Sequence, residues 1–298
     1  MSVKNILLET RPQFLLLSPI LVFLGMGIAL YSGSFNTLYF VLSIIGLVLL
    51  HASVNTLNDY NDFRTGVDLK TNRTPFSGGS GFLPAGLLKP STVLAIGLVT
   101  FFLAVPIGIY FLLKLGWNLA PLFIIGAVFV MIYTSHLTKI GLGVGEISAG
   151  LGLGTLPVLG TFIIINGGFT YDALYASIPS GFLVFNLLLL NEFPDAEADK
   201  IANRKTLPII LGHRKAAIVY STLVAATYLW IIVGVVLKIM PVWTLLALLT
   251  LPLGIKAIRG SLTYKKLEEL IPAQGANVMI VLGIQFLMGL GYVLANVI

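Results

Sequence analysis

Two short stretches of the sequence combine amide and carboxylate side chains at a spacing that could bind a cation. Residues 55–68 read NTLNDYNDFRTGVD and residues 191–199 read NEFPDAEAD. Each stretch places one amide and two carboxylates three or four residues apart: Asn55, Asp59 and Asp62 in the first, and Asn191, Asp195 and Asp199 in the second. In a helix each set shares one face. Because like charges at neighbouring helical positions are destabilising unless a cation lies between them, this spacing predicts two cation half-sites.

The residue types indicate which cation these half-sites prefer. The chain has no cysteine, so thiolate ligands and thiol nucleophiles are both excluded. Oxygen ligands alone favour a hard cation, Mg²⁺ first, with Mn²⁺ and Ca²⁺ as alternatives. Mg²⁺ is usually held by a few carboxylates together with substrate phosphates, and a sparse set of oxygens suits that arrangement.

The two acidic stretches are followed by similar basic segments. The first continues TNRTPFSGG (71–79) and the second ANRKTLPII (202–210), so that Asn-Arg, then Thr, then Pro recur in both. We interpret this as an internal repeat that places two half-sites opposite each other. Basic residues in these segments could then neutralise a bound polyanion: Arg73, Arg204 and Lys205. The general excess of basic residues on one side of a membrane protein is the alternative explanation for them.

The rest of the chain is apolar enough to require a bilayer. Hydrophobic types make up 57% of the 298 residues and charged types 10%, whereas soluble domains carry about 25% charged residues. The mean hydropathy is +0.98. We expect an all-α integral membrane protein that forms one domain over 1–298, a single bundle of nine transmembrane helices. The predicted spans are 14–31, 39–57, 92–113, 119–134, 144–165, 173–190, 216–237, 240–255 and 276–297.

The basic residues predict how the bundle is oriented. With the N-terminus in the cytoplasm, all Lys and Arg residues except Lys114 and Lys238 lie on the cytoplasmic side. Two long polar segments, 58–91 and 191–215, are expected as loops on that side. We therefore expect a protein of the cell membrane whose site, built from these loops, faces the cytoplasm. This bias accounts for the net charge of +6 better than a nucleic-acid partner does, and no nucleic-acid motif occurs.

On these motifs the chain resembles the UbiA superfamily of intramembrane prenyltransferases. NDYNDFRTGVD (58–68) and NEFPDAEAD (191–199) are similar to its two aspartate-rich motifs. Many members carry an acid at the ninth position of the first motif, where this chain has Gly66, and its last acid follows at Asp68. That ending, and the segment YTSHLTKIGLGVGE (133–146), look like the dihydroxynaphthoate (menaquinone) branch.

The resemblance implies a laterally open bundle that binds an isoprenyl diphosphate through two Mg²⁺ ions and alkylates a small or lipid acceptor. It implies membrane lipid as surroundings and no obligate protein partner. Carried onto this sequence, one ion would be held by Asn55, Asp59 and Asp62, with help from Asp68, and the other by Asp195 and Asp199, with Asn191 beside them. The residues that neutralise the diphosphate would be Lys70, Arg73, Lys139, Arg204 and Lys205. The catalytic set would be Asp59, Asp62, Asp195 and Asp199, with Tyr133 near the reacting allylic carbon.

Two further polar residues near the spans have open roles. His51 lies one helical turn before Asn55 and could assist the acceptor or a metal, or could simply be a packed histidine. Glu146, near the start of the fifth span, is costly in lipid unless paired, and Lys139 is a possible partner.

Other functions suit parts of this pattern. A transporter also fits nine spans with an internal repeat, but transporter sites lie near the bilayer midplane, whereas these acids lie at helix ends. A CDP-alcohol phosphotransferase would need an Asp-Gly-x-x-Ala-Arg signature, which the chain lacks. Within prenyl transfer, the acceptor could be an aromatic quinone precursor, which the motif variant favours, or a glycerophosphate ether lipid. Donor length and oligomeric state are not encoded in these motifs.

The topology yields the first testable prediction. Reporter tags inserted in 77–81 and in 200–204 should both report the cytoplasm, because the basic residues flank both segments, and a C-terminal tag should report the opposite side. Fusions to a reporter that is active on one side only would measure this. Finding the two acidic segments on opposite faces would rule out a shared site.

Overall fold

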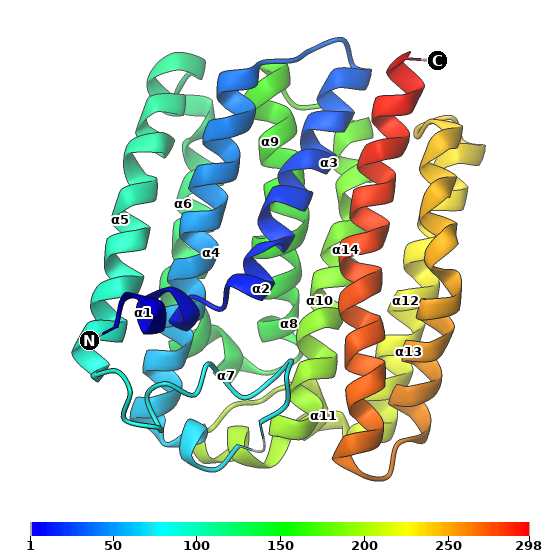
Figure 1. The fold of residues 1–298 in the computed structure, drawn as a ribbon. Helices are drawn as coiled ribbons and strands as arrows, with labels where there is room; N and C mark the ends of the chain where they lie inside the picture. Colours follow the sequence, from blue (N-terminus) through cyan, green and yellow to red (C-terminus); the bar gives the residue numbers. More distant parts are fainter. Residues whose placement is uncertain (1, 72, 298) are drawn as a thin grey trace.

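A computed structural model describes residues 2–71 and 73–297, and its regular elements are all helical in that part of the chain. Figure 1 shows a single bundle of roughly parallel and antiparallel helices. The α-helices in chain order are α1 (Val3–Glu9), α2 (Pro12–Leu15), α3 (Leu17–Tyr31), α4 (Thr37–Thr65), α5 (Pro90–Leu115), α6 (Ala120–Ile132), α7 (Thr138–Ile140), α8 (Val144–Gly150), α9 (Leu156–Asn166), α10 (Tyr171–Asp199), α11 (Leu207–Leu211), α12 (His213–Val236), α13 (Leu251–Thr263) and α14 (Leu267–Val297). The short 3₁₀ and π segments are η1 (Val67–Leu69), η2 (Trp117–Leu119), η3 (Tyr133–Leu137), η4 (Leu151–Thr155), η5 (Lys200–Ala202) and η6 (Val242–Thr250).

The prediction of nine spans is confirmed. Within the described residues, nine helical segments are long and apolar enough to cross a membrane: Pro12–Tyr31, Thr37–Thr65, Pro90–Leu115, Trp117–Ile140, Val144–Asn166, Tyr171–Ala202, His213–Val236, Val242–Thr263 and Leu267–Val297. Large apolar side chains cover the outside of the bundle, for example Phe102 on α5 and Leu229 on α12. Outward-facing apolar residues are what a lipid solvent requires. The cytoplasmic placement of the N-terminus and the internal repeat stay predictions, and Asn72 of the first repeat lies outside the described residues.

The structure differs from the sequence prediction where the two acidic segments begin. The stretches 58–65 and 191–199, expected within the loops 58–91 and 191–215, are helical and belong to α4 and α10. Each of these helices has 29 residues and is therefore about 44 Å long, against roughly 30 Å of hydrocarbon. The polar end of each helix extends past the apolar zone, so its residues stay helical although they read as loop.

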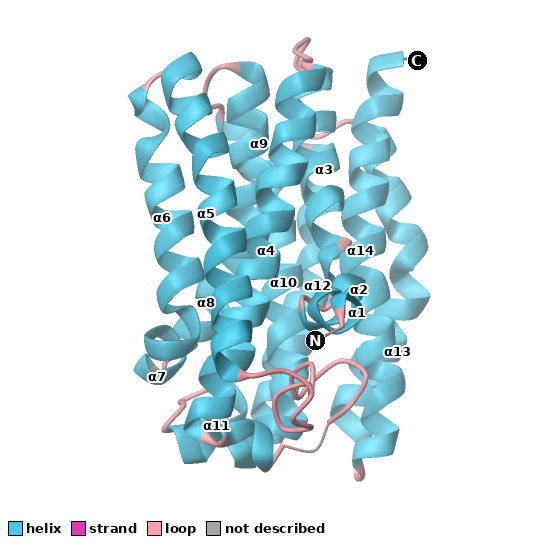
Figure 2. Ribbon diagram, turned by 60° about the vertical axis from the view of Figure 1, so that its left-hand side comes forward, coloured by secondary structure: helices cyan, strands magenta, loops and turns pink. Residues whose placement is uncertain are grey.

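Both extended ends lie at the same end of the bundle. In Figure 1 the segments after α4 and α10 lie at the lower end, and α14 finishes at the upper end. Figure 2, turned by 60°, shows the long loop between α4 and α5 crossing beneath α1 and α2. The two acidic helix ends, far apart in sequence, are thus brought to one side.

Small residues allow the helices around the site to pack closely. The main buried core joins α3, α9, α10, α12 and α14 around fully buried side chains such as Leu21, Phe162 and Ile284. A Cβ added at Gly154 in η4 would lie 2.5 Å from the carbonyl oxygen of Ser180 on α10. Backbones can approach this closely only where a side chain is missing.

This close approach gives a stability prediction. Gly154→Val should lower the free energy of unfolding by about 1–3 kcal/mol, since overpacking forces α10 away from η4. Thermal unfolding in detergent, followed by circular dichroism, measures the change. Gly168→Ala is the matched control, because a Cβ there meets no atom within 4 Å. Equal midpoints for the two variants would contradict the packing argument.

Candidate functional site

The polar ends of α4 and α10 enclose a cavity of about 140 Å³ that we call the polar cavity. Five of the predicted metal ligands line it: Asp62, Asp68, Asn191, Asp195 and Asp199. Both acidic motifs thus contribute residues to one cavity, and their role as metal ligands stays a prediction. Glu192 lines the same cavity and is buried. It belongs to the second motif, but sequence analysis gave it no role.

Arg204 joins the two motifs directly. Its Nη1 donates to Oδ1 of Asp199 at 2.7 Å, and its Nη2 donates to Oδ1 of Asp62. The preceding Asn203 has φ +56°, a left-handed conformation that asparagine tolerates, and it turns the chain back after η5. One guanidinium thus neutralises a carboxylate from each half of the site. Removing it would leave two buried carboxylates without their counter-charge.

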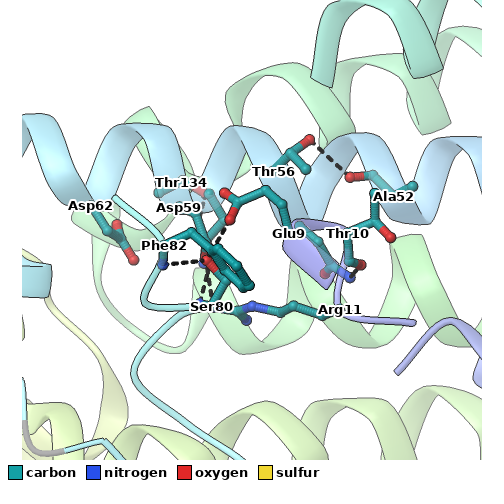
Figure 3. A network of polar contacts seen from close by, with 12 residues as sticks. Glu9, Thr10, Arg11, Ala52, Thr56, Asp59, Asp62, Ser80, Phe82 and Thr134 are labelled. Atoms are coloured by element: carbon teal, nitrogen blue, oxygen red, sulfur yellow. Dashed lines mark hydrogen bonds and ion pairs between the residues drawn. The ribbon is translucent and has the colours of Figure 1, made fainter. Parts of the chain in front are cut away.

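Arg11 neutralises Asp59 in the same way. Its Nη2 donates to Oδ1 of Asp59 at 2.6 Å, and the backbone N–H of Ser80 donates to Oδ2 at 2.8 Å (Figure 3). Asp59 is 1% exposed. Sequence reasoning treated Arg11 only as part of the charge bias, because no local pattern links residues so far apart in the chain. The left-handed φ of +55° at Arg11, where α2 begins, had no sequence signal either.

Asp68 shows that negative charge is in excess here. The pKa of Asp68 is raised to about 8, chiefly by burial and also by the charges of Asp62 and Asp59, with Arg11 and Arg73 partly offsetting the rise. A cation bound beside these carboxylates would favour their ionised forms. The electrostatics of the polar cavity therefore suit a bound divalent cation.

The donor set fits Mg²⁺ in chemistry, although its carboxylates accept hydrogen bonds from arginines and from Thr71. Within residues 2–71 and 73–297, no three His, Cys, Asp or Glu side chains converge as a formed metal site. Asp59, Asp62 and Asp199 accept hydrogen bonds from arginines, and Asp195 accepts one from the hydroxyl of Thr71. All of these ligands are oxygens, as a hard cation requires. Binding such an ion would require some of these contacts to open.

The amides of the two motifs have mainly structural partners. Nδ2 of Asn55 donates to the carbonyl oxygen of Thr10 at 3.1 Å, and Asn55 lines the neighbouring apolar cavity. Oδ1 of Asn191 accepts from Nε2 of Gln274 at 3.3 Å. Asn58, which sequence analysis did not single out, accepts at 2.6 Å from the hydroxyl of Thr134 and lines both cavities.

Of the five basic residues expected to neutralise a diphosphate, Arg204 lines the polar cavity. The other four, Lys70, Arg73, Lys139 and Lys205, are not among its lining residues in the described structure. The backbone N–H of Lys205 donates to Thr138 at 2.9 Å, and its side chain lies against Gly141. Arg73 lies against Gly78 and Gly81 of its own loop. Their diphosphate-binding role stays a prediction, and Arg11 joins Arg204 as a basic residue that lines the cavity.

Tyr133 lies where the polar cavity meets an apolar one. This apolar cavity, of about 250 Å³, shares six lining residues with the polar cavity: Arg11, Asn58, Phe76, Tyr133, Leu188 and Asn191. Tyr133 begins the π-helical segment η3, a distortion that often marks functional sites and has no clear sequence signature. A second apolar cavity, of about 140 Å³, shares Leu47, Leu50, Gly126 and Gly152 with the first.

His51 and Glu146 both have partners within the fold. Nδ1 of His51 lies 3.0 Å from Oγ of Ser18, and His51 lines the apolar cavity. Oε1 of Glu146 accepts from the backbone N–H of Leu207 at 2.6 Å. Glu146 therefore links α8 to the start of α11, whereas sequence analysis had named Lys139 as its possible partner.

Comparison with known proteins agrees with this architecture. The chain is 26% identical over 287 residues to the 1,4-dihydroxy-2-naphthoate octaprenyltransferase of Bacillus subtilis (strain 168), which covers 96% of this chain and 91% of that protein. Its fold is similar to the apo structure of a UbiA homolog from Aeropyrum pernix K1, with TM-score 0.70 and 16% identity over 95% of this chain and 98% of that chain.

A UbiA homolog from Archaeoglobus fulgidus, bound to GPP and Mg²⁺, also has a similar fold, with TM-score 0.62 and 14% identity over 97% of this chain and 99% of that chain. The chain further matches the UbiA prenyltransferase family over residues 16–294. Since that match spans nearly all of the sequence, this protein belongs to the UbiA prenyltransferase family.

Proposed function

We propose that this prenyltransferase transfers an isoprenyl chain from a polyprenyl diphosphate to an aromatic quinone-precursor acceptor, with Mg²⁺ as cofactor and with release of pyrophosphate. The observation that carries the proposal is the shared boundary of the polar cavity and the apolar cavity. A polyprenyl diphosphate has one highly charged end and one long apolar end. Two adjoining cavities of matching character accommodate both ends of that donor.

The charged end of the donor belongs in the polar cavity. Arg204 and Arg11 lie there as guanidinium groups that can bind phosphate oxygens through paired N–H donors. The ligands for Mg²⁺ are the carboxylates of both motifs, Asp59 and Asp62 on α4 and Asp195 and Asp199 on α10, with Asp68 beside them. When bound, Mg²⁺ stabilises negative charge on the diphosphate oxygens. The bound GPP and Mg²⁺ of the Archaeoglobus fulgidus homolog support this assignment.

The residues at the boundary then act on the reacting carbon. As the C–O bond breaks, its electron pair leaves with the diphosphate, and a delocalised allylic cation remains at the end of the chain. We assign Tyr133 the role of stabilising that cation, and its position in the lining of both cavities supports this. The apolar lining around it, including Phe129 and Leu188, excludes water that would otherwise capture the cation. A carbon of the acceptor ring forms the new C–C bond and then loses its proton.

The proposed acceptor rests on two observations. The first motif ends in Gly66-x-Asp68, the variant that resembles the dihydroxynaphthoate branch. The relative from Bacillus subtilis is named as a 1,4-dihydroxy-2-naphthoate octaprenyltransferase and matches over almost its whole length. A glycerophosphate ether lipid is the alternative acceptor. Incubating purified protein with a labelled polyprenyl diphosphate and each acceptor in turn, and identifying the product, tests the choice. A product formed with the lipid alone would overturn the aromatic assignment.

Removal of one carboxylate charge from either motif should abolish turnover. Asp62→Asn and Asp195→Asn should each lower the rate by about 100-fold or more, because each loses a charged oxygen that binds the cation and faces the leaving group. Pyrophosphate release in the presence of Mg²⁺ measures this. Asp172→Asn is the control, since Asp172 lies exposed at the opposite end of the same helix, α10. Full activity in the motif variants, or in wild type after chelation, would refute Mg²⁺-dependent transfer.

Tyr133 should affect the chemical step more than donor binding. Tyr133→Phe should lower kcat on the order of tenfold, or ~1.4 kcal/mol, with little change in the donor KM, because its oxygen matters once the cation forms. Steady-state kinetics with the donor varied separate the two constants. Tyr110→Phe serves as control, since Tyr110 packs with Phe111 on α5, away from the polar cavity. An unchanged kcat in Tyr133→Phe would remove Tyr133 from the reaction.

A further inference from the structure

Glu9 is a buried acid at the end of a helix whose other face is exposed. On α1, Val3 and Leu7 are 71% and 61% exposed, whereas Glu9 has 0% of its surface exposed. The pKa of Glu9 is raised to about 7, chiefly by burial and also by the charge of Asp59, with the Ser80 hydrogen bond and Arg11 partly offsetting the rise. A carboxyl group is costly to bury unless it makes hydrogen bonds. A hydrogen-bond partner outside α1 is therefore needed to compensate for the burial of Glu9.

Ser80 connects Glu9 to the metal-ligand set. The hydroxyl of Ser80 donates to Oε2 of Glu9 at 2.6 Å, and its backbone N–H donates to Oδ2 of Asp59 at 2.8 Å. Figure 3 shows these contacts together with the Arg11–Asp59 ion pair. Through one serine, the end of α1 is thus linked to the polar end of α4.

Ser80 belongs to residues 73–81, which we call the cavity loop. Its Ser77, Gly78 and Gly79 line the polar cavity. Across the described residues from Thr71 to Lys89, three hydrogen bonds that involve side chains reach other elements. One joins Thr71 to Asp195, and the other two are both made by Ser80. Among the described residues of the cavity loop, Ser80 therefore supplies the side-chain hydrogen bonds to the bundle, while Phe76 lies near Gly275 of α14.

The loop fits tightly against the carboxylates where it is attached. Gly79 has φ +74°, and a Cβ there would lie 3.1 Å from Oδ1 of Asp68 and 3.2 Å from Nη2 of Arg11. Ser80 directly follows Gly79 in the chain, so the attachment of Ser80 bears on how closely Gly79 lies to both groups. The wall of the polar cavity depends on where Ser80 is held.

We propose that Glu9 is a positioning residue that holds the cavity loop against Asp59 through the hydroxyl of Ser80. Glu9 does not line the polar cavity and touches no substrate in this scheme. It fixes Ser80, whose backbone N–H in turn orients the carboxylate of Asp59. The consequence for donor binding rests on the proposed function, whereas the consequence for the loop itself does not.

The test of the loop uses purified full-length protein without any substrate. Hydrogen–deuterium exchange of the amides in 73–81 should be about ten- to a hundredfold faster in Glu9→Ala, the change expected from losing one charge-assisted hydrogen bond. Glu9→Gln should lie between Glu9→Ala and wild type, because its carbonyl oxygen still accepts from Ser80 but carries no charge. Lys4→Ala, on α1 but outside this network, is the matched control.

Two further variants separate positioning from general destabilisation. Ser80→Ala should accelerate the same amides as Glu9→Ala, and the double variant should be no faster than either single one, because both remove the same contact. If the proposed transfer is also correct, each should raise the donor KM several-fold and leave the acceptor KM unchanged. Unchanged exchange in Glu9→Ala, faster exchange throughout the bundle, or additive effects in the double variant would each overturn the proposal. A lack of prenyl transfer would overturn the proposed function, but the exchange results would still test whether Glu9 positions the cavity loop.

Discussion

The central constraint on this structure is the burial of several carboxylates at the end of an apolar bundle. Charges taken out of water are stable only when they are paired and hydrogen-bonded. Arg204 meets this need between Asp62 and Asp199, and Arg11 meets it at Asp59. Each arginine follows or occupies a left-handed position, Asn203 or Arg11 itself, so the backbone accepts local strain where the charges must be brought together.

That constraint also explains the architecture around the site. The acids can meet only if α4 and α10 continue as helices beyond the hydrocarbon, which places successive ligands on one face of each helix. The loop between α4 and α5 then covers the charges, and Gly79 of this loop lies close to the carboxylates of Asp68 and Asp59. Close packing of η4 against α10 at Gly154 keeps the helices near the site in fixed positions.

The number of spans could be predicted from hydropathy, and the expectation that the two acidic motifs share one site came from their similar sequences and from the family resemblance. It misplaced the helix ends, since polar residues in 58–65 and 191–199 read as loop although they extend helices. It could not identify Arg11, Glu9 or Ser80, because their contacts join residues far apart in the chain. It also could not locate Lys205, whose charge suited a diphosphate but whose side chain packs against Gly141. Charge and motif predict which residues are available, whereas tertiary contacts decide which ones face the cavity.

The boundary between the two kinds of cavity has a chemical meaning for a donor of the proposed kind. The bond that breaks in such a donor is the one that joins its apolar chain to its charged head, so it must lie where the apolar and polar cavities meet. The residues common to both cavities include Asn58, Tyr133 and Asn191, which are polar but uncharged at neutral pH. A carboxylate at that point could trap the allylic cation, and a fully apolar wall could not orient the head group. Uncharged polar side chains at the boundary avoid both outcomes, and Arg11, a charged residue that also lines both cavities, is a cation suited to the leaving diphosphate rather than a carboxylate that could trap the allylic cation.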